Sequence, residues 1–387
     1  MPTEALGWFA AGWCLLANSI HVASTILARG GGARPTGPGI PISRLSVVAP
    51  MRGEGDASPE YLDALAGLQR EGAEVLICVA DASDGAAEVV RRHWLDAGQG
   101  HPPLLIGALE TFNPKMNNAA KGFDMARGDV VALCDAGVLL DGETVAGAMG
   151  ALSGRVGLVL ALKWAEAGEG AAAALEAAWI DGHQARFLLA ADRLGIPVAS
   201  GGVTFIDRAT LNRVGGWRGF FGYIADDYAI ARSVRRTGLG TRLSASMPRV
   251  RLGRRSWAAV WDRQVRWART RLRLPVWPLV IWEPAVGLAS AVAVGLAALC
   301  ILIPDAGSTE VAAYLGMQIA LWMAAEFAFL TGHDARAGWR AILAGLAREL
   351  LTWPLLATAL LGRDLVWRGS DLGGDWRRGA ARDGEPT

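Results

Sequence analysis

Four long apolar runs stand out in the pattern of hydrophobic and polar positions. They cover Ala5 to Leu27, Ile281 to Pro304, Val311 to Thr331 and Ala341 to Leu361. A helix of about 20 residues crosses the roughly 30 Å hydrocarbon core of a bilayer, so each run is long enough to be a membrane span. The first run exceeds the apolar core of a typical secretory signal, and we interpret it as a retained anchor. The fourth carries Arg348 and Glu349, costly charges that should face protein or a lipid head group.

The distribution of basic residues predicts how these runs are oriented. Arginines follow the first run, no Lys or Arg precedes it, and the loop between the second and third runs has none. The positive-inside rule therefore places the middle of the chain in the cytoplasm. Arg336 and Arg340 after the third run agree with this orientation. The arginine-rich tail, residues 363–387, disagrees if the fourth run crosses the membrane, so a re-entrant fourth run remains open.

Between the first two runs, short apolar stretches alternate with amphipathic ones. A Gly/Pro-rich linker of residues 31–43 is followed by strand-like stretches that begin at Leu45, Glu74, Leu104 and Asp129, each separated from the next by a helix-like stretch. This alternation predicts an α/β domain with a mainly parallel sheet and helices on both faces. We place this domain at residues 44–253.

Polar residues follow the strands at one edge of the predicted sheet. Pro50 to Glu54 follows the first strand, Asp81 ends the second, and Asp135 ends the strand that begins at Asp129. Ligands of such sheets bind beyond the carboxyl ends of the strands. Two neighbouring carboxylates repel unless a cation or donor-rich ligand lies between them, and a nucleotide diphosphate with a divalent metal meets that need. The alternative is that each aspartate only starts a turn or caps a helix.

Two adjacent carboxylates, Asp226 and Asp227, begin a further predicted helix that ends at Arg235-Arg236-Thr237-Gly238. An acidic residue at a helix N-terminus contributes roughly 0.3–1 kcal/mol, and one such residue is enough for that purpose. We therefore take the second, Asp227, as a candidate catalytic group.

Residues 254–275 read as an amphipathic helix. Ser256 can cap its N-terminus, and its apolar face consists of Trp257, Trp261, Val265, Ala268 and Leu272. Trp267 lies off this face, among arginines. We expect the apolar face to lie in lipid at the membrane interface and the opposite side to face an active site. A generic basic helix on anionic lipid explains the arginines but not Trp267.

Composition narrows the class of protein further. The formal net charge of +1 gives no overall attraction to nucleic acid, and the four cysteines have no metal-site spacing. The preference for Arg, Ala and Gly is typical of a GC-rich bacterial genome, so we expect a protein of a bacterial inner membrane. Nothing in the sequence indicates an oligomeric state.

Four blocks, in this order, resemble the ceramide glucosyltransferases, which are inverting glycosyltransferases of the GT-A fold. They are NPKMNN from Asn113, the turn Asp135-Ala136-Gly137, the helix start Ala225-Asp226-Asp227-Tyr228, and RQVRW from Arg263. They are similar to that family's NPKxNN block, Asp-Ser-Gly turn, Ala-Glu-Asp-Tyr helix and (Q/R)xxRW motif. The resemblance runs from about Leu45 onward and implies a Rossmann-like GT-A domain between membrane segments, with residues 1–30 as anchor and 281–362 as C-terminal membrane region.

The resemblance implies a role for each site residue. Asp81 would hold the uridine part of a UDP-sugar, Asp135 would bind Mg²⁺ or Mn²⁺ on the diphosphate, and Asp227 would be the general base. The other expected donor-binding residues are Pro50, Arg52, Glu54, Lys115 and Asn117. The motif that closes over diphosphate and acceptor would be Arg263, Arg266 and Trp267. The expected acceptor-binding residues are His183, Asp226, Arg348 and Glu349.

Two departures from the family pattern matter for these roles. Asp135-Ala136-Gly137 lacks the second carboxylate of the usual Asp-x-Asp, so a metal there would have one protein carboxylate. Asp226 replaces the usual Glu.

The resemblance implies transfer of glucose from UDP-glucose to ceramide with inversion. Galactose, glucuronic acid or N-acetylglucosamine are alternative sugars, and hopanoids or diacylglycerol are alternative acceptors. A polysaccharide synthase shares these motifs but needs more spans than we count. A membrane scaffold with a decayed transferase domain is the non-enzymatic alternative.

Overall fold

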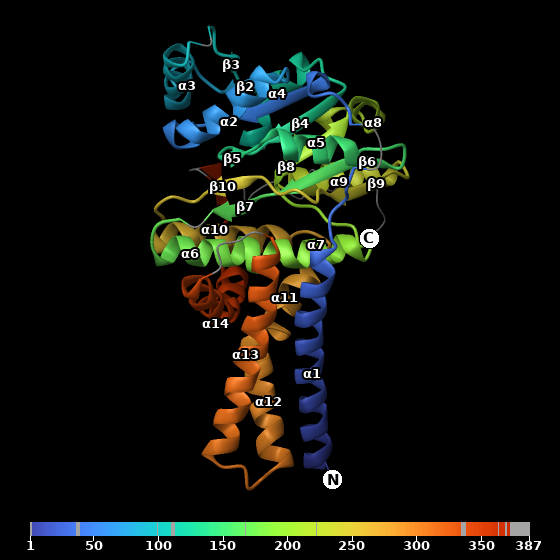
Figure 1. Cartoon of the computed structure of the whole chain (residues 1–387), viewed down its shortest axis with the longest axis vertical. Coiled ribbons are helices and arrows are strands. Elements are labelled where there is room, and N and C mark those ends of the chain that lie inside the picture. Colours follow the sequence, from blue (N-terminus) through green and yellow to red (C-terminus); the bar gives the residue numbers. More distant parts are fainter. Residues whose placement is uncertain are drawn as a thin grey trace. The chain divides into compact units, whose positions relative to one another are not determined.

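The computed structural model describes residues 2–35, 39–98, 100–109, 113–166, 168–221, 223–333, 338–362, 364–367 and 370–371 (Figure 1). Arg336, most of the tail and part of the linker lie outside them. Two compact units alternate along the chain. The helical unit lies within Met1–Gly30, Ala167–Leu194 and Leu252–Gly373, and the sheet unit within Gly31–Glu166 and Gly195–Arg251.

The sheet unit is built on a seven-stranded sheet with the order β3-β2-β1-β4-β8-β6-β9. Its strands are β1 (Leu45–Pro50), β2 (Glu74–Val79), β3 (Leu104–Ile106), β4 (Val130–Cys134), β6 (Val156–Leu162), β8 (Gly202–Asp207) and β9 (Gly240–Leu243). Only β8 is antiparallel to its neighbours within this sheet. β1 and β4 are buried along their whole length, which is why both read as unbroken apolar runs. The expected mainly parallel sheet is confirmed.

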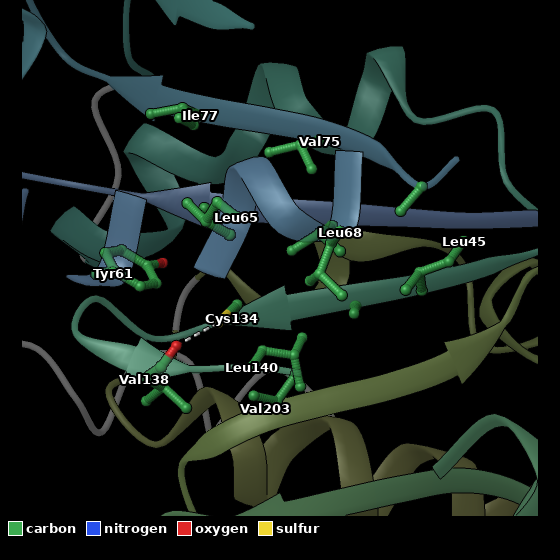
Figure 2. Packing of buried hydrophobic residues seen from close by; sticks show 14 of the residues in the cluster. Leu45, Tyr61, Leu65, Leu68, Val75, Ile77, Cys134, Val138, Leu140 and Val203 are labelled. Atoms are coloured by element: carbon green, nitrogen blue, oxygen red, sulfur yellow. Dashed lines mark hydrogen bonds between the residues drawn. The ribbon is translucent and has the colours of Figure 1, made fainter. Parts of the chain in front are cut away.

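Helices cover both faces of this sheet, as the alternation predicts. The helices α2 (Pro59–Arg70), α3 (Gly85–Asp96) and α5 (Gly142–Ala151) join the apolar core that contains Leu45, Val75 and Val203 (Figure 2). The helix α4 (Pro114–Met125) packs on the other face, where a Cβ at Gly122 would lie 2.7 Å from Cys78 Sγ. Glycine at this position lets α4 approach the sheet closely.

The sheet unit also contains three short strands and two further helices. The strands β5 (Val138–Leu139), β10 (Arg249–Arg251) and β7 (Trp164–Glu166) form a small second sheet. The helices α8 (Arg208–Arg213) and α9 (Asp226–Arg236) follow β8 along the chain, and α9 begins at the predicted pair of aspartates.

The helical unit contains the apolar runs. Among its described residues, three helices are long and apolar enough to cross a membrane: α1 (Pro2–Arg29), α13 (Ser308–Gly332) and α14 (Trp339–Leu361). The second run instead forms two helices, α11 (Trp277–Ala285) and α12 (Leu288–Leu302), bent by 50°. Figure 1 shows α1 alongside α12 and α13, and all three are in contact. Reciprocal hydrogen bonds of 3.0 and 2.8 Å between the Asn18 and Gln318 amides join α1 to α13.

The break between α11 and α12 is built into the fold. Pro284 lies within α11, and its carbonyl accepts both the Gly287 N–H at 3.2 Å and a hydrogen bond of 2.7 Å from Ser290 Oγ. The amide N–H of Leu288, at the start of α12, donates to Glu349 Oε2 at 2.9 Å. Both ends of the break therefore have polar partners, as backbone groups at membrane depth require.

Residues 168–194 belong to the helical unit, although their position lies inside the domain expected at 44–253. They form α6 (Ala171–Ala177), the π-helical segment η3 (Ala178–Ala185) and α7 (Arg186–Arg193). Leu175 and Trp179 pack with Val260, Val265 and Leu355. The apolar partners of this segment are thus distant in sequence, so the sequence pattern did not separate residues 168–194 from the predicted domain.

The amphipathic helix of residues 254–275 is α10 (Trp257–Leu272), and Ser256 caps it by accepting the Ala259 N–H at 3.1 Å. Part of its apolar face packs against protein and not outward, where lipid was expected. Val260, Val265 and Ala268 are buried against protein, in clusters that include residues of α6 and α14. Trp257, at the helix start, is 60% exposed.

Candidate active site

The N-terminus of α4 positions the centre of the site in the sheet unit. Asn113 Oδ1 accepts the N–H groups of Lys115 and Met116 at 3.0 and 3.2 Å, and Pro114 occupies the first helical position. The Asn113 side chain also donates to the Tyr223 carbonyl at 2.7 Å, close in sequence to α9. One cap residue therefore ties α4 to the loop that leads into α9, the helix that begins with Asp226 and Asp227.

Lys115 connects two of the predicted aspartates. Its Nζ lies 3.1 Å from Asp135 Oδ1 and 2.7 Å from Asp226 Oδ2. Burial lowers the pKa of Lys115, but the charges of Asp135 and Asp226 outweigh burial and raise the pKa above its ordinary value. Lys115 is therefore a fixed cation between the end of β4 and the start of α9.

Asp135 and Asp227 differ in the direction of their pKa shifts. Burial raises the pKa of Asp135, but Lys115 and Lys163 outweigh it and hold that pKa below its ordinary value. Burial and the charge of Asp226 raise the pKa of Asp227 to about 6, while Lys115 opposes the rise. Asp135 is thus held in its ionised form, and the pKa of Asp227 approaches neutral pH, the property that a general base needs.

The loops after β1 and β2 carry the remaining residues expected at the donor. Asp81 is exposed, and its Oδ1 accepts the backbone and hydroxyl hydrogens of Ser83 at 2.8 Å each, which lowers the pKa of Asp81. Pro50 ends β1, and Glu54 begins a 3-10 turn. The Arg52 N–H donates to Asp56 at 2.8 Å.

Asn118 is a positioning residue that the sequence analysis missed. It is buried, and its Nδ2 donates to the Met51 carbonyl at 3.1 Å, which fixes the loop after β1. Its neighbour Asn117 is half-buried on α4. The signal was present in NPKMNN, whose last asparagine has this structural task.

A metal ion at Asp135 would need oxygen atoms from a bound molecule as well, because the protein offers one carboxylate there. No group of three His, Cys, Asp or Glu side chains that could hold a metal occurs among the residues with described positions. Asp135 Oδ1 faces Lys115, and Oδ2 faces Gly201, where a Cβ would come within 3.1 Å. Mg²⁺ binds through one or two carboxylates with phosphate oxygens and water, which matches one available carboxylate beside a diphosphate.

In the helical unit, Arg263 of the RQVRW motif is paired with a buried acid. Glu176 on α6 is fully buried and forms ion pairs with Arg263 and, at 3.2 Å, with Arg255. Arg266 and Trp267 lie half-buried on α10. Glu176 therefore holds the helix that carries the motif, and the sequence analysis missed it.

Arg348 and Glu349 are buried within the helical unit and bonded to protein groups. Arg348 donates to Glu326 at 2.8 and 2.7 Å, to Glu349 at 2.6 Å and to the Ala178 carbonyl at 2.9 Å. A Cβ at Gly182 would lie 2.8 Å from Arg348 Nη1. This cluster joins α13 and α14 to η3, the segment that carries His183.

His183 lies in a second polar cluster of the helical unit. Its Nε2 is 3.7 Å from Glu283 Oε2 on α11, and Glu283 Oε1 pairs with Arg271 at the end of α10. Neither Glu283 nor Arg271 was expected from the sequence.

Comparisons with known proteins show which proteins this chain resembles. Residues 11–379 match the model of glycosyl transferase family 21. Ceramide glucosyltransferase 1 of Caenorhabditis elegans is 24% identical over 354 residues, which cover 88% of this chain and 73% of that protein. Ceramide glucosyltransferase 3 of the same organism is 24% identical over 233 residues, 59% of this chain and 51% of that protein.

One solved structure extends the likeness to the fold. It is the mannosyltransferase PcManGT from Pyrobaculum calidifontis in complex with GDP-Man and Mn²⁺, with 18% identity and a TM-score of 0.52. The match covers 90% of this chain and 99% of that one. The sheet unit has the GT-A fold that the motifs predicted.

Proposed function

Because this chain belongs to glycosyl transferase family 21 and is therefore a glycosyltransferase, we propose that it moves glucose from UDP-glucose to the primary hydroxyl of ceramide, with inversion. The observation that carries the proposal is the group of Asp135, Lys115, Asp226 and Asp227. It combines an ionised ligand group, a fixed cation and a base with a pKa of about 6 at one edge of the sheet.

In the proposed reaction, the acceptor hydroxyl oxygen attacks the anomeric carbon while its proton passes to Asp227. The bond between that carbon and the diphosphate breaks, and UDP leaves with the electron pair. A positioned general base typically contributes 10²–10⁴-fold to such a step. Lys115 keeps Asp226 and Asp135 neutralised, so that Asp227 is the carboxylate free to take the proton.

The donor site we propose uses the loops at the carboxyl ends of β1, β2 and β4. Asp81 holds the uridine part, with Pro50, Arg52, Glu54 and Asn117 beside it. A divalent cation, Mg²⁺ or Mn²⁺, bound by Asp135 and diphosphate oxygens would supply positive charge to the leaving UDP. Arg266 and Trp267 contribute to diphosphate and acceptor binding, as the family motif implies, and Arg263 keeps the motif in place through Glu176.

The acceptor is a lipid of the membrane in which the helical unit lies. Of the residues first expected there, we retain His183 as a contact and Asp226 as a neighbour of the base. Arg348 and Glu349 take a positioning role, since their polar groups are engaged by Glu326, Ala178 and Leu288. We propose the cytoplasmic face of a bacterial inner membrane as the location of the sheet unit.

The test uses purified protein in detergent with Mg²⁺ or Mn²⁺. The donors offered are UDP-glucose, UDP-galactose, UDP-glucuronic acid and UDP-N-acetylglucosamine. Each is combined with ceramide, diacylglycerol or a hopanoid as acceptor. We measure the release of UDP and the formation of glycolipid. We expect ceramide hexoside from wild type and at least a 100-fold loss in Asp227→Asn. Asp124→Asn, an exposed carboxylate paired with Arg218, is the control and should keep full activity. Product with another lipid alone would exclude ceramide, and full activity of Asp227→Asn would exclude the mechanism.

A further inference from the structure

The cluster of His183, Glu283 and Arg271 is open to a ligand and rigidly held. Its side chains are 14%, 25% and 38% exposed, so all three can be reached from outside the unit. The His183 ring packs edge-on against Phe187 at 5.1 Å. Beside Glu283, Trp282 stacks on Trp13 of α1 at 5.5 Å.

The helix that carries Glu283 is also fixed through its backbone. Trp13 Nε1 donates to the Ala285 carbonyl at 3.1 Å, so α11 is joined to the first span. A carboxylate on a fixed helix, with one oxygen paired to an arginine, presents its other oxygen in a fixed direction. Such preorganisation is what a specificity site requires.

The surroundings of the cluster are those of a membrane boundary. Trp277 and Trp282 on α11 are 51% and 48% exposed, and α11 precedes the apolar helix α12. Exposed tryptophans are enriched where membrane meets water, at the level of lipid head groups. The groups that reach Glu283 from outside are therefore those of a lipid head.

The chemistry of Glu283 selects among lipid head groups. Its carboxylate, neutralised by Arg271, can only accept hydrogen bonds. Oε2 lies 3.7 Å from His183 Nε2, and the side chain is 25% exposed, so the second lone pair of Oε2 can accept a donor that approaches from outside. Ceramide carries an amide N–H and a second hydroxyl next to its primary hydroxyl. Diacylglycerol carries esters, which only accept hydrogen bonds. An acceptor that the bound lipid shields from water without supplying a donor is penalised, so such a site discriminates strongly.

We propose that Glu283, held by Arg271 and facing His183, accepts a hydrogen bond from the amide N–H or the second hydroxyl of the acceptor lipid and so selects ceramide over diacylglycerol. This inference rests on the proposed function. It assigns the specificity-determining contact to a residue outside every motif block.

The test compares Glu283→Gln with wild type on four acceptors: ceramide, N-methylceramide, 3-deoxyceramide and diacylglycerol. We expect Glu283→Gln to raise the KM for ceramide about 10-fold or more and to leave the KM for UDP-glucose unchanged. One of the two ceramide analogues should be a poor substrate for wild type and lose nothing further in the variant, because it lacks the donor that Glu283 receives. Glu169→Gln, a carboxylate paired with Arg254 on the exposed surface of the same unit, is the matched control.

An equal loss of activity with all four acceptors would overturn the inference and leave the proposed function standing. If wild type glycosylates no ceramide, the proposed function fails, and a binding measurement then tests Glu283 by itself. Short-chain ceramide should raise the melting temperature of wild type and Glu169→Gln more than short-chain diacylglycerol does. The same preference in Glu283→Gln would show that Glu283 does not select the lipid. Arg271→Lys, which keeps the positive charge, should retain most of the preference.

Discussion

In the sheet unit, Lys115 forms ion pairs with two of the three aspartates of the candidate site. The third aspartate therefore has a different electrostatic environment. Lys115 contacts Asp135 and Asp226 directly, so both share its positive charge. The pKa of Asp227 is raised by burial and by the charge of Asp226, and these outweigh the opposing effects of Lys115 and of the Tyr228 N–H at 2.8 Å. Adjacent residues of one helix thereby acquire different chemical roles.

This difference predicts a pH dependence of catalysis. Asp227 must be deprotonated to accept the hydroxyl proton, and burial together with Asp226 raises its pKa to about 6. We expect kcat/KM for the acceptor to fall as pH decreases through about 6 and to level off above about 7. Asp226→Asn removes the neighbouring negative charge, so its acid limb should move to lower pH. An acid limb that stays at the same pH in Asp226→Asn would assign the titration to another group.

In the helical unit, Glu176 pairs with two arginines, as Lys115 pairs with two aspartates in the sheet unit. Glu176→Gln leaves Arg263 and Arg255 without their buried counter-ion, and breaking a buried pair typically costs about 3–5 kcal/mol. We expect a lower melting temperature and a KM for UDP-glucose raised several-fold, measured on the same preparation. Arg254→Gln, next to Arg255 but on the exposed surface, should change neither value. A variant that loses stability with an unchanged KM would give Glu176 a purely structural role.

At the scale of elements, the cap of α4 couples helix stability to the site. Asn113→Ala removes hydrogen bonds to Lys115, Met116 and Tyr223, and loss of an N-cap costs about 1 kcal/mol. We expect a lower melting temperature and weaker UDP binding, because Lys115 and the loop before α9 lose their common anchor. Ser58→Ala removes the cap of α2 and should lower the melting temperature with unchanged UDP binding. Equal UDP affinity in both variants would contradict this coupling.

Elements also show what could be predicted from the sequence. β1, β2 and β4 are buried on both faces and so read directly as apolar runs, and the capped helices α2, α3, α4 and α10 carry their start signals. The direction of β8 and the partners of residues 168–194 depend on contacts distant in sequence, which periodicity does not contain. For the same reason the arginine partners of Glu176, Glu283 and Glu326 could not be identified from the sequence, although Glu283 and Glu326 lie inside apolar runs where a charge is costly.

At the scale of the whole molecule, the basic residues predict an orientation that the fold does not test. We expect a cysteine introduced by Ser308→Cys, at the start of α13, to be labelled from outside intact cells by a membrane-impermeant thiol reagent. Ser153→Cys, on the exposed surface of the sheet unit, should be labelled only after the cells are opened. Labelling in the opposite order would reverse the orientation and place the donor site outside the cytoplasm.

The interleaving of the two units along the chain determines the order in which the protein can assemble during synthesis. α1 is made first, but its partners α12 and α13 begin at Leu288 and Ser308, after the whole sheet unit. At about 5–20 residues per second, α12 emerges roughly 13–50 seconds after α1. Through that interval Asn18 has no Gln318 to bond. The nascent chain therefore needs the insertion machinery to shelter the Asn18 side chain of an apolar helix in the membrane until α13 has been translated.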